Sequence, residues 1–122
     1  MSIVIIAEKP SVAKDIANVL QVKDKKDTHW HSDKIIITWA MGHLLQLKYP
    51  EEYNSDLSNW HKTFDQLPYV PDSFDFKPNP YTKKQLNGVL KLIKDKSVSE
   101  IVNACDAARE GELIFRSIIQ HS

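Results

Sequence analysis

The sequence predicts an α/β fold, because one strand–turn–helix pattern occurs near both ends of its 122 residues. Residues 3–7 and 101–105 are apolar runs typical of buried strands. The first run is continuous and β-branched, as in strands of a parallel sheet that is covered on both faces. A polar turn and an amphipathic helix follow each run. The length suits a single domain.

The first strand leads through a tight turn into a helix. Glu8-Lys9-Pro10-Ser11 interrupts the apolar run, and Ser11 is the expected helix cap. Apolar residues at helical spacing then give this helix one apolar face. Residues 23–27 are a charged run that we expect to be a solvated loop. Residues 29–31 and 35–39 flank a polar turn, as the two strands of a hairpin do.

The second half of the chain predicts a long loop, a helix, a strand and a final helix. Residues 49–80 carry five of the six prolines and seven aromatic side chains, which indicates an ordered loop with short helical pieces. In residues 81–96, apolar side chains recur at i, i+3, i+4 and i+7, as in an amphipathic helix. The acid-rich stretch 106–112 then separates the second strand from an apolar-faced helix that begins at residue 113.

Charge and cysteine content exclude several classes of protein. Sixteen basic and sixteen acidic residues give a formal net charge of zero, so the chain has no strongly basic arm for nucleic acid. Cys105 is the only cysteine, which excludes an intramolecular disulfide and a zinc site made of thiolates. No apolar run is long enough to span a membrane. We expect a cytoplasmic protein with no membrane partner.

Charged residues follow both predicted buried strands. They are Glu8 and Lys9 after the first, and Asp106, Arg109, Glu110 and Glu112 after the second. Ligands of parallel α/β sheets lie outside the carboxyl ends of the strands. If the two strands are neighbours, the carboxylates suit Mg²⁺ and the two cations suit phosphate, as in a phosphoryl-transfer site. Taken singly, each acid is better explained as a solvated or helix-capping side chain.

Four segments carry a more specific pattern. They are Glu8-Lys9-Pro10-Ser11 with residues 12–17, Thr38-Trp39-Ala40-Met41-Gly42-His43-Leu44, Leu67-Pro68-Tyr69-Val70-Pro71, and Asn103-Ala104-Cys105-Asp106-Ala107-Ala108-Arg109-Glu110-Gly111-Glu112-Leu113-Ile114. In this order they resemble signatures of the type IA DNA topoisomerases, closest to the topoisomerase III branch. The resemblance implies a Toprim fold over residues 1–122, with a Rossmann-like, mainly parallel central sheet flanked by helices. It also implies Mg²⁺-dependent cleavage, passage and resealing of DNA strands.

The resemblance implies roles for five residues. Glu8 matches a glutamate by the scissile phosphate that ligates metal or transfers a proton. Lys9 matches a lysine that contacts that phosphate. Asp106 and Glu110 match the first and third acids of the family's Asp-x-Asp-x-Glu motif, and with Glu8 they are the expected Mg²⁺ ligands. Arg109 matches the arginine inside this motif and is expected to orient phosphate or the neighbouring acids.

Two further candidates and one departure accompany these residues. Glu112 is expected to cap its helix in preference to reaching the metal through water. His43 follows Gly42 near the implied active face, and a structural hydrogen bond to a backbone carbonyl explains it at least as well. Ala108 stands where many members carry the second aspartate, so we expect weak Mg²⁺ binding without DNA and no two-metal site.

The length of the chain departs from the family, whose members are several-fold longer. None of the four tyrosines, at positions 49, 53, 69 and 81, lies in a setting that resembles the family's nucleophile motif. We therefore expect an N-terminal fragment, which acts on single-stranded DNA together with the remaining topoisomerase domains and does not relax DNA alone.

Three other functions are weighed against this one. A Toprim domain of a primase or nuclease is disfavoured by the topoisomerase-like signatures at residues 8–11 and 42–44. A phospho-acceptor signalling domain is disfavoured because residues 49–80 fill the middle of the chain. A DNA-binding module without catalysis is suggested by Ala108. The three tryptophans could stack on bases, but packing is favoured for each: Trp30, Trp39 and Trp60.

Overall fold

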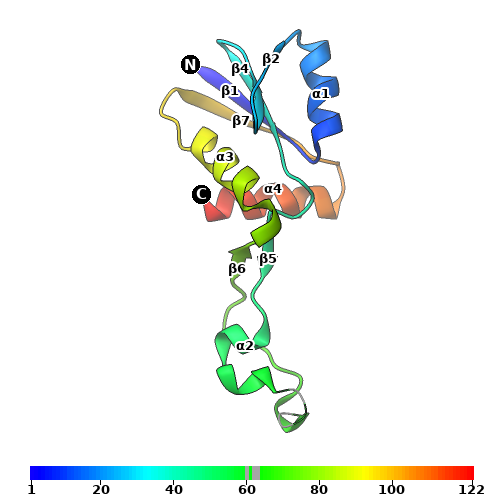
Figure 1. The fold of residues 1–122 in the computed structure, drawn as a ribbon, viewed down its shortest axis with the longest axis vertical. Coiled ribbons are helices and arrows are strands. Elements are labelled where there is room, and N and C mark those ends of the chain that lie inside the picture. The colour runs from blue at the N-terminus through cyan, green and yellow to red at the C-terminus, as the bar shows by residue number, and fades with distance from the viewer. Residues whose placement is uncertain (60, 62–63) are drawn as a thin grey trace.

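The computed structural model describes residues 1–59, 61 and 64–122, and Figure 1 shows its fold. A sheet and three helices form the body, and a narrow arm projects from it. The strands and α-helices in chain order are β1 (Ser2–Ala7), α1 (Pro10–Val19), β2 (Asp24–Lys25), β3 (His29–His31), β4 (Ile35–Trp39), β5 (Leu45–Leu47), α2 (Pro50–Tyr53), β6 (Phe76–Pro78), α3 (Lys83–Ile93), β7 (Val98–Ala104) and α4 (Arg109–His121). Short 3₁₀ helices lie at Ser55–Ser58, Phe64–Gln66 and Pro80–Thr82.

The central sheet has five strands in the order β2-β3-β4-β1-β7. Its three strands β4, β1 and β7 run parallel, while β3 pairs antiparallel with both β2 and β4. The predicted α/β class and the hairpin of residues 29–39 are confirmed. The charged run 23–27 was predicted as a loop, and this was wrong, because Asp24 and Lys25 pair with His31 and Trp30 at the edge of the sheet.

Helices cover both faces of the sheet. Val4 and Ile6 of β1 face a core that α3 and α4 complete, with Leu86 and Ile114 fully buried. The opposite face is covered by α1, whose Ala13 and Ala17 pack beside Ile37 and Trp39 of β4. Small alanines let this helix lie close to the strands. The alternating burial along β1 reflects the two-residue period of a strand.

The arm comprises residues 45–59, 61 and 64–79. The antiparallel pair β5–β6 forms its base, with Leu45 opposite Pro78, and α2 lies further out. Short helical pieces were predicted here and are present, but the β5–β6 ladder was not predicted. Inside the arm, the Tyr53 hydroxyl accepts a 2.7 Å hydrogen bond from the Asp75 amide, and Lys77 pairs with Glu52 at 2.8 Å.

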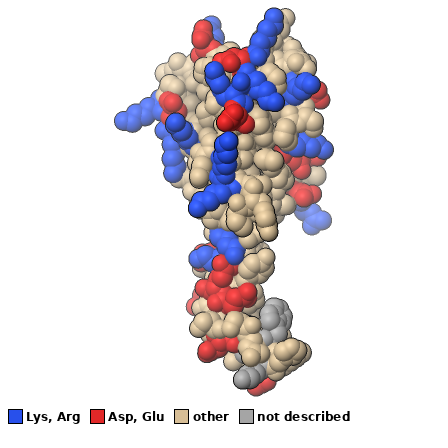
Figure 2. All heavy atoms as spheres, in the orientation of Figure 1, with Lys and Arg blue, Asp and Glu red and all other residues tan. Residues whose placement is uncertain are grey.

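Charge is distributed unevenly between arm and body. In the sequence, residues 45–79 include six acidic and three basic residues, which leaves thirteen basic and ten acidic residues for the rest of the neutral chain. Figure 2 shows acidic side chains gathered along the arm and many Lys and Arg side chains over the body. Large apolar side chains are also exposed on the arm, including Phe64, Val70 and Phe74.

Several element boundaries differ from those predicted. Helix α1 begins at Pro10 with Lys9 as its N-cap residue, so Ser11 lies inside the helix and was wrongly assigned as the cap. Proline favours the first helical position because it lacks the amide hydrogen that would be unpaired there. Helix α3 is shorter than residues 81–96, and β7 starts three residues before Ile101. Over the described residues, no helix combines the length and apolar character needed to cross a membrane.

Candidate metal and phosphate site

The two predicted strand ends meet at one edge of the sheet. Strands β1 and β7 are parallel neighbours, and Ala7 pairs with Ala104. Glu8 and Asp106 therefore leave the sheet side by side, although 98 positions separate them in sequence. The Asp106 backbone amide donates a 3.3 Å hydrogen bond to Glu8 Oε2. The neighbour relation on which the sequence argument depended is present in the structure.

A close backbone approach shapes the turn between β7 and α4. A Cβ atom at Gly111 would overlap the carbonyl oxygen of Asp106 and come within 2.8 Å of its amide nitrogen. Only glycine lets the first turn of α4 lie this close to the chain leaving β7. Gly111 thus fixes the position of Asp106 relative to the helix.

The helices on each side of the site begin without side-chain caps. The N-cap residues are Lys9 for α1 and Ala108 for α4, both in extended conformation, and neither side chain accepts a hydrogen bond from the first turn. Both helix starts follow the carboxyl ends of neighbouring strands. Amides in the first turn of a helix carry partial positive charge and favour an anion. Two such ends therefore give this edge of the sheet a preference for anions.

Cys105 lies among the acids. It is half-buried, and its Sγ donates to the carbonyl oxygen of Ile6 at 3.7 Å. Burial and, after it, the negative charges of Glu8, Asp106 and Glu112 together raise the pKa of its thiol to about 11. The thiol is protonated at neutral pH, so it is a packing group and a poor nucleophile.

Glu110 is paired with His43. Oε1 of Glu110 lies 3.3 Å from Nε2 of His43, and both side chains are largely exposed. His43 comes from the connection between β4 and β5, where Gly42 adopts φ +71°. This positive φ favours glycine and turns the chain toward α4. The structure therefore gives His43 a carboxylate partner in place of the backbone carbonyl considered from the sequence.

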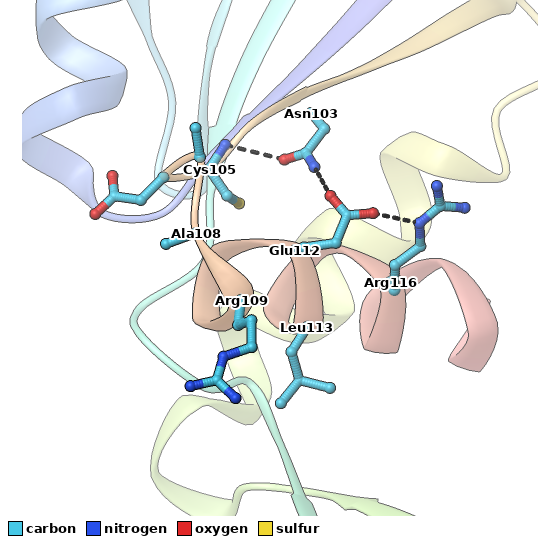
Figure 3. Close-up of a pocket in the computed structure, with 9 residues that line it drawn as sticks. Asn103, Cys105, Ala108, Arg109, Glu112, Leu113 and Arg116 are labelled. Carbon is cyan, nitrogen blue, oxygen red and sulfur yellow. Dashed lines mark hydrogen bonds and ion pairs between the residues drawn. The ribbon is translucent and has the colours of Figure 1, made fainter.

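Glu112 is not a helix cap. Its carboxylate accepts a 3.0 Å hydrogen bond from Asn103 Nδ2 and a 2.7 Å hydrogen bond from Arg116 Nε (Figure 3). The expected capping role was wrong, because Arg116 lies four residues later on the same helix face and competes for the carboxylate. Asn103, which the sequence argument did not single out, also accepts a 3.0 Å hydrogen bond from the Cys105 amide.

Arg109 is directed away from this hydrogen-bonded group. Figure 3 shows Arg109 and Leu113 projecting from α4 away from Asn103 and the Glu112–Arg116 pair. The open cavity around them has a volume of about 900 Å³ and also includes Asp106 in its lining. Within the described residues, neither Arg109 nor Lys9 has an ion-pair partner within 4.0 Å. Their charges are available to a ligand.

The donor set suits Mg²⁺ without forming a complete cage. Glu8, Asp106 and Glu110 supply carboxylate oxygens at or beside one edge of the sheet, and these are the ligands that Mg²⁺ prefers. Over residues 1–59, 61 and 64–122, no group of three or more His, Cys, Asp or Glu side chains converges closely enough to hold a metal ion. Mg²⁺ usually takes one or two carboxylates together with waters and a substrate phosphate, which fits this sparse arrangement.

Comparison with known proteins identifies the family. The sequence model of the Toprim domain matches residues 3–122. The chain belongs to the Toprim domain family. The Toprim domain is 40% identical over 119 residues to "DNA topoisomerase 3" of Staphylococcus saprophyticus and 41% identical over 119 residues to the proteins of that name from Staphylococcus aureus strains USA300 and MRSA252. Each match covers 98% of this chain and 16% of the relative, so the Toprim domain spans about a sixth of the length of these relatives.

The tyrosines of the Toprim domain belong to other elements than the turns that carry Glu8 and Asp106. Tyr49, Tyr53 and Tyr69 belong to the arm, where the rings of Tyr53 and Tyr69 are 6.2 Å apart. Tyr81 lies in the 3₁₀ helix that precedes α3 and is 96% exposed. Trp39 is buried at the end of β4, whereas Trp60 lies outside the described residues.

Proposed function

We propose that this Toprim domain is the Mg²⁺-binding catalytic part of a cytoplasmic type IA DNA topoisomerase. Such an enzyme is an ATP-independent isomerase that cuts one DNA strand, passes DNA through the break and reseals it. The attacking tyrosine comes from another part of the protein. The observation that carries the proposal is the parallel pairing of β1 with β7, which brings Glu8 and Asp106 together. The names of the relatives favour this function over a primase or nuclease.

Asp106, Glu110 and Glu8 are the residues that would hold Mg²⁺. When bound, the ion supplies positive charge that lowers the cost of charge developing on the phosphate oxygens. Because the motif has Ala108 in place of a further acid, the protein offers few ligands. Binding of the ion then depends on waters and on the DNA phosphate, so metal and DNA bind cooperatively.

Lys9 and Arg109 bind and orient the scissile phosphate. Neither cation is committed to an ion pair among the described residues, and each lies at the start of a helix whose first-turn amides also favour anions. Glu8 holds or moves the proton of the DNA oxygen that cleavage releases, through the carboxylate oxygen that the Asp106 amide does not occupy. Its other oxygen accepts the Asp106 amide, which restricts the orientation of the carboxylate.

A chimera tests this function. Residues 1–122 replace the matching 119-residue segment of the S. aureus DNA topoisomerase 3. The chimera is expected to relax negatively supercoiled plasmid in Mg²⁺, and Asp106→Asn is expected to abolish relaxation. Glu100→Gln, a matched acid-to-amide change elsewhere on β7, is the control. Equal relaxation by the Asp106→Asn chimera and its parent would contradict the proposal.

A second measurement tests the metal site on the chain itself, so its result does not depend on how well the two parts of the chimera fit together. Amide NMR follows the 122-residue chain during Mg²⁺ titration, with and without a single-stranded oligonucleotide. We expect saturable shifts at Glu8, Lys9 and residues 106–112, at lower Mg²⁺ concentration when the oligonucleotide is present. An absence of shifts under both conditions would reject a metal site at this edge of the sheet.

A further inference from the structure

A small pocket lies at the start of α1, on the face of the sheet that this helix covers. Its volume is about 170 Å³, and its lining residues are Pro10, Ser11, Lys14, Lys25, Trp30 and Trp39. Pro10 and Ser11 come directly after Glu8 and Lys9, so two lining residues of the pocket adjoin, in the chain, the residues proposed to contact the phosphate. We call it the tryptophan pocket.

The lining of the pocket combines aromatic walls with a basic rim. Trp39 is buried at the carboxyl end of β4, where it pairs with Ala7, the residue before Glu8. Trp30 of β3 is half-buried, and Lys25 Nζ lies 5.6 Å from its ring centroid. Lys14 and Lys25 are exposed, and within the described part of the chain neither has an ion-pair partner. Lys25 Nζ lies over the ring of Trp30, so a flat ligand ring stacks on Trp30 by taking the place of this ammonium, and an anion attached to the ligand can reach the two lysines.

The size of the pocket restricts its ligand. Pockets for drug-sized molecules have volumes of about 300–1,000 Å³, so a volume of about 170 Å³ suits one ring system and excludes a whole nucleoside triphosphate. A duplex cannot present a base face to such a pocket without unpairing. A single strand offers unstacked bases joined by phosphates, which matches both the aromatic wall and the basic rim.

From these observations we propose that the tryptophan pocket binds one base of single-stranded DNA, stacked on Trp30, with the adjacent phosphates held by Lys14 and Lys25. This inference rests on the proposed function, because it takes single-stranded DNA as the partner. Binding of a base there fixes the register of the strand as it passes the Glu8-Lys9 turn. The pocket is thus a positioning site for the strand.

Photocrosslinking tests the position of the base directly. The probe is a single-stranded oligonucleotide in which 5-bromouracil replaces one thymine at a time, irradiated with the 122-residue chain and mapped by mass spectrometry. We expect an adduct on Trp30 in one register. Adducts only at other residues would contradict binding of a base in the tryptophan pocket, but they would leave the proposed function intact. If none of the oligonucleotides bound the chain, both the base-binding pocket and the proposed function would be contradicted.

Binding measurements test the stacking. Trp30→Ala is expected to weaken binding of the intact strand on the order of five- to a hundredfold, and to leave binding of a strand with an abasic sugar in that register unchanged. Tyr81→Ala, at a fully exposed ring outside the pocket, is the control. Equal losses for both strands would contradict the proposal. Ser11→Leu, which fills the pocket from its exposed rim, must reproduce the loss without disturbing the packing of Trp30.

Discussion

The backbone amide of Asp106 and the carboxylate of Glu8 are joined by a 3.3 Å hydrogen bond across 98 positions of the chain. The bond links the loop after β7 to the loop after β1, so the two halves of the proposed site are held by the protein before any ion or DNA binds. It also directs one oxygen of Glu8 toward the backbone and leaves the other for a ligand. A site built in this way has part of its geometry fixed in advance, which lowers the entropic cost of binding.

The N-cap position of α4 offers a substitution that separates helix stability from metal binding. Ala108 has the extended backbone of an N-cap but cannot accept a hydrogen bond, so Ala108→Asp and Ala108→Asn should each raise the free energy of unfolding by about 0.5–2 kcal/mol. Only Ala108→Asp adds a hard ligand, so it alone should tighten Mg²⁺ binding in the NMR titration. Equal Mg²⁺ affinities of the two variants would show that this position does not face the metal.

Gly111 is predicted to tolerate no side chain. Gly111→Ala places a Cβ against the Asp106 backbone, and relief of the overlap should cost about 1–3 kcal/mol of unfolding free energy, measured by urea denaturation. The shift should also displace the Asp106 amide and change its NMR signal. Leu113→Ala, at a half-exposed position of the same helix, serves as the control. A stabilising Gly111→Ala, as helix propensity alone would give, contradicts the close approach.

Gln85 of α3 is predicted to stabilise the end of β4. Its side chain is only 6% exposed, and Nε2 donates to the carbonyl oxygens of Trp39 at 2.8 Å and Thr28 at 3.1 Å. Gln85→Leu leaves these acceptors without that donor and should lower the unfolding free energy by about 1–3 kcal/mol. Gln120→Leu, an exposed position, should change it by less than about 0.5 kcal/mol. Similar losses for both variants would refute the structural role.

Cys105 should make the stability of the domain fall at high pH. Its thiol pKa is raised from 9.0 to about 11 in the folded chain, so the unfolded chain releases this proton first as the pH rises. The stabilisation is fully present below pH 9 and is lost between pH 9 and about 11. Unfolding free energies of wild type and Cys105→Ala, measured from pH 8 to 11, should differ by an amount that changes across this interval. A constant difference would contradict the raised pKa.

Local patterns predicted most of the elements but not their contacts. The apolar runs of β1 and β7 and the apolar faces of α1 and α4 are local features that periodicity detects. The pairing of β1 with β7 could only be assumed from the sequence, because no local sequence pattern specifies which strands become neighbours in a sheet. The β5–β6 ladder was missed since each strand has three residues and β6 ends in Pro78.

Side-chain partners were harder still to predict. Ser11 was assigned as a cap from residue preference alone, while the fixed φ of Pro10 starts the helix two residues earlier. Glu112 was predicted to cap α4 because it lies in the first turn of that helix. In the structure its carboxylate instead accepts a hydrogen bond from Arg116. Pairs such as Glu110 with His43 depend on the path of a loop between other strands. Such contacts follow from the tertiary fold.

The opposite charges of arm and body give the neutral molecule a large electric dipole moment. In the field of a polyanion such a molecule experiences a torque, which turns the positive body toward the phosphates and the negative arm away from them. Orientation therefore begins before contact, at distances within the Debye length of about 10 Å in 0.1 M salt. Neutrality of the whole chain conceals this effect, because a torque depends on the separation of charges and not on their sum.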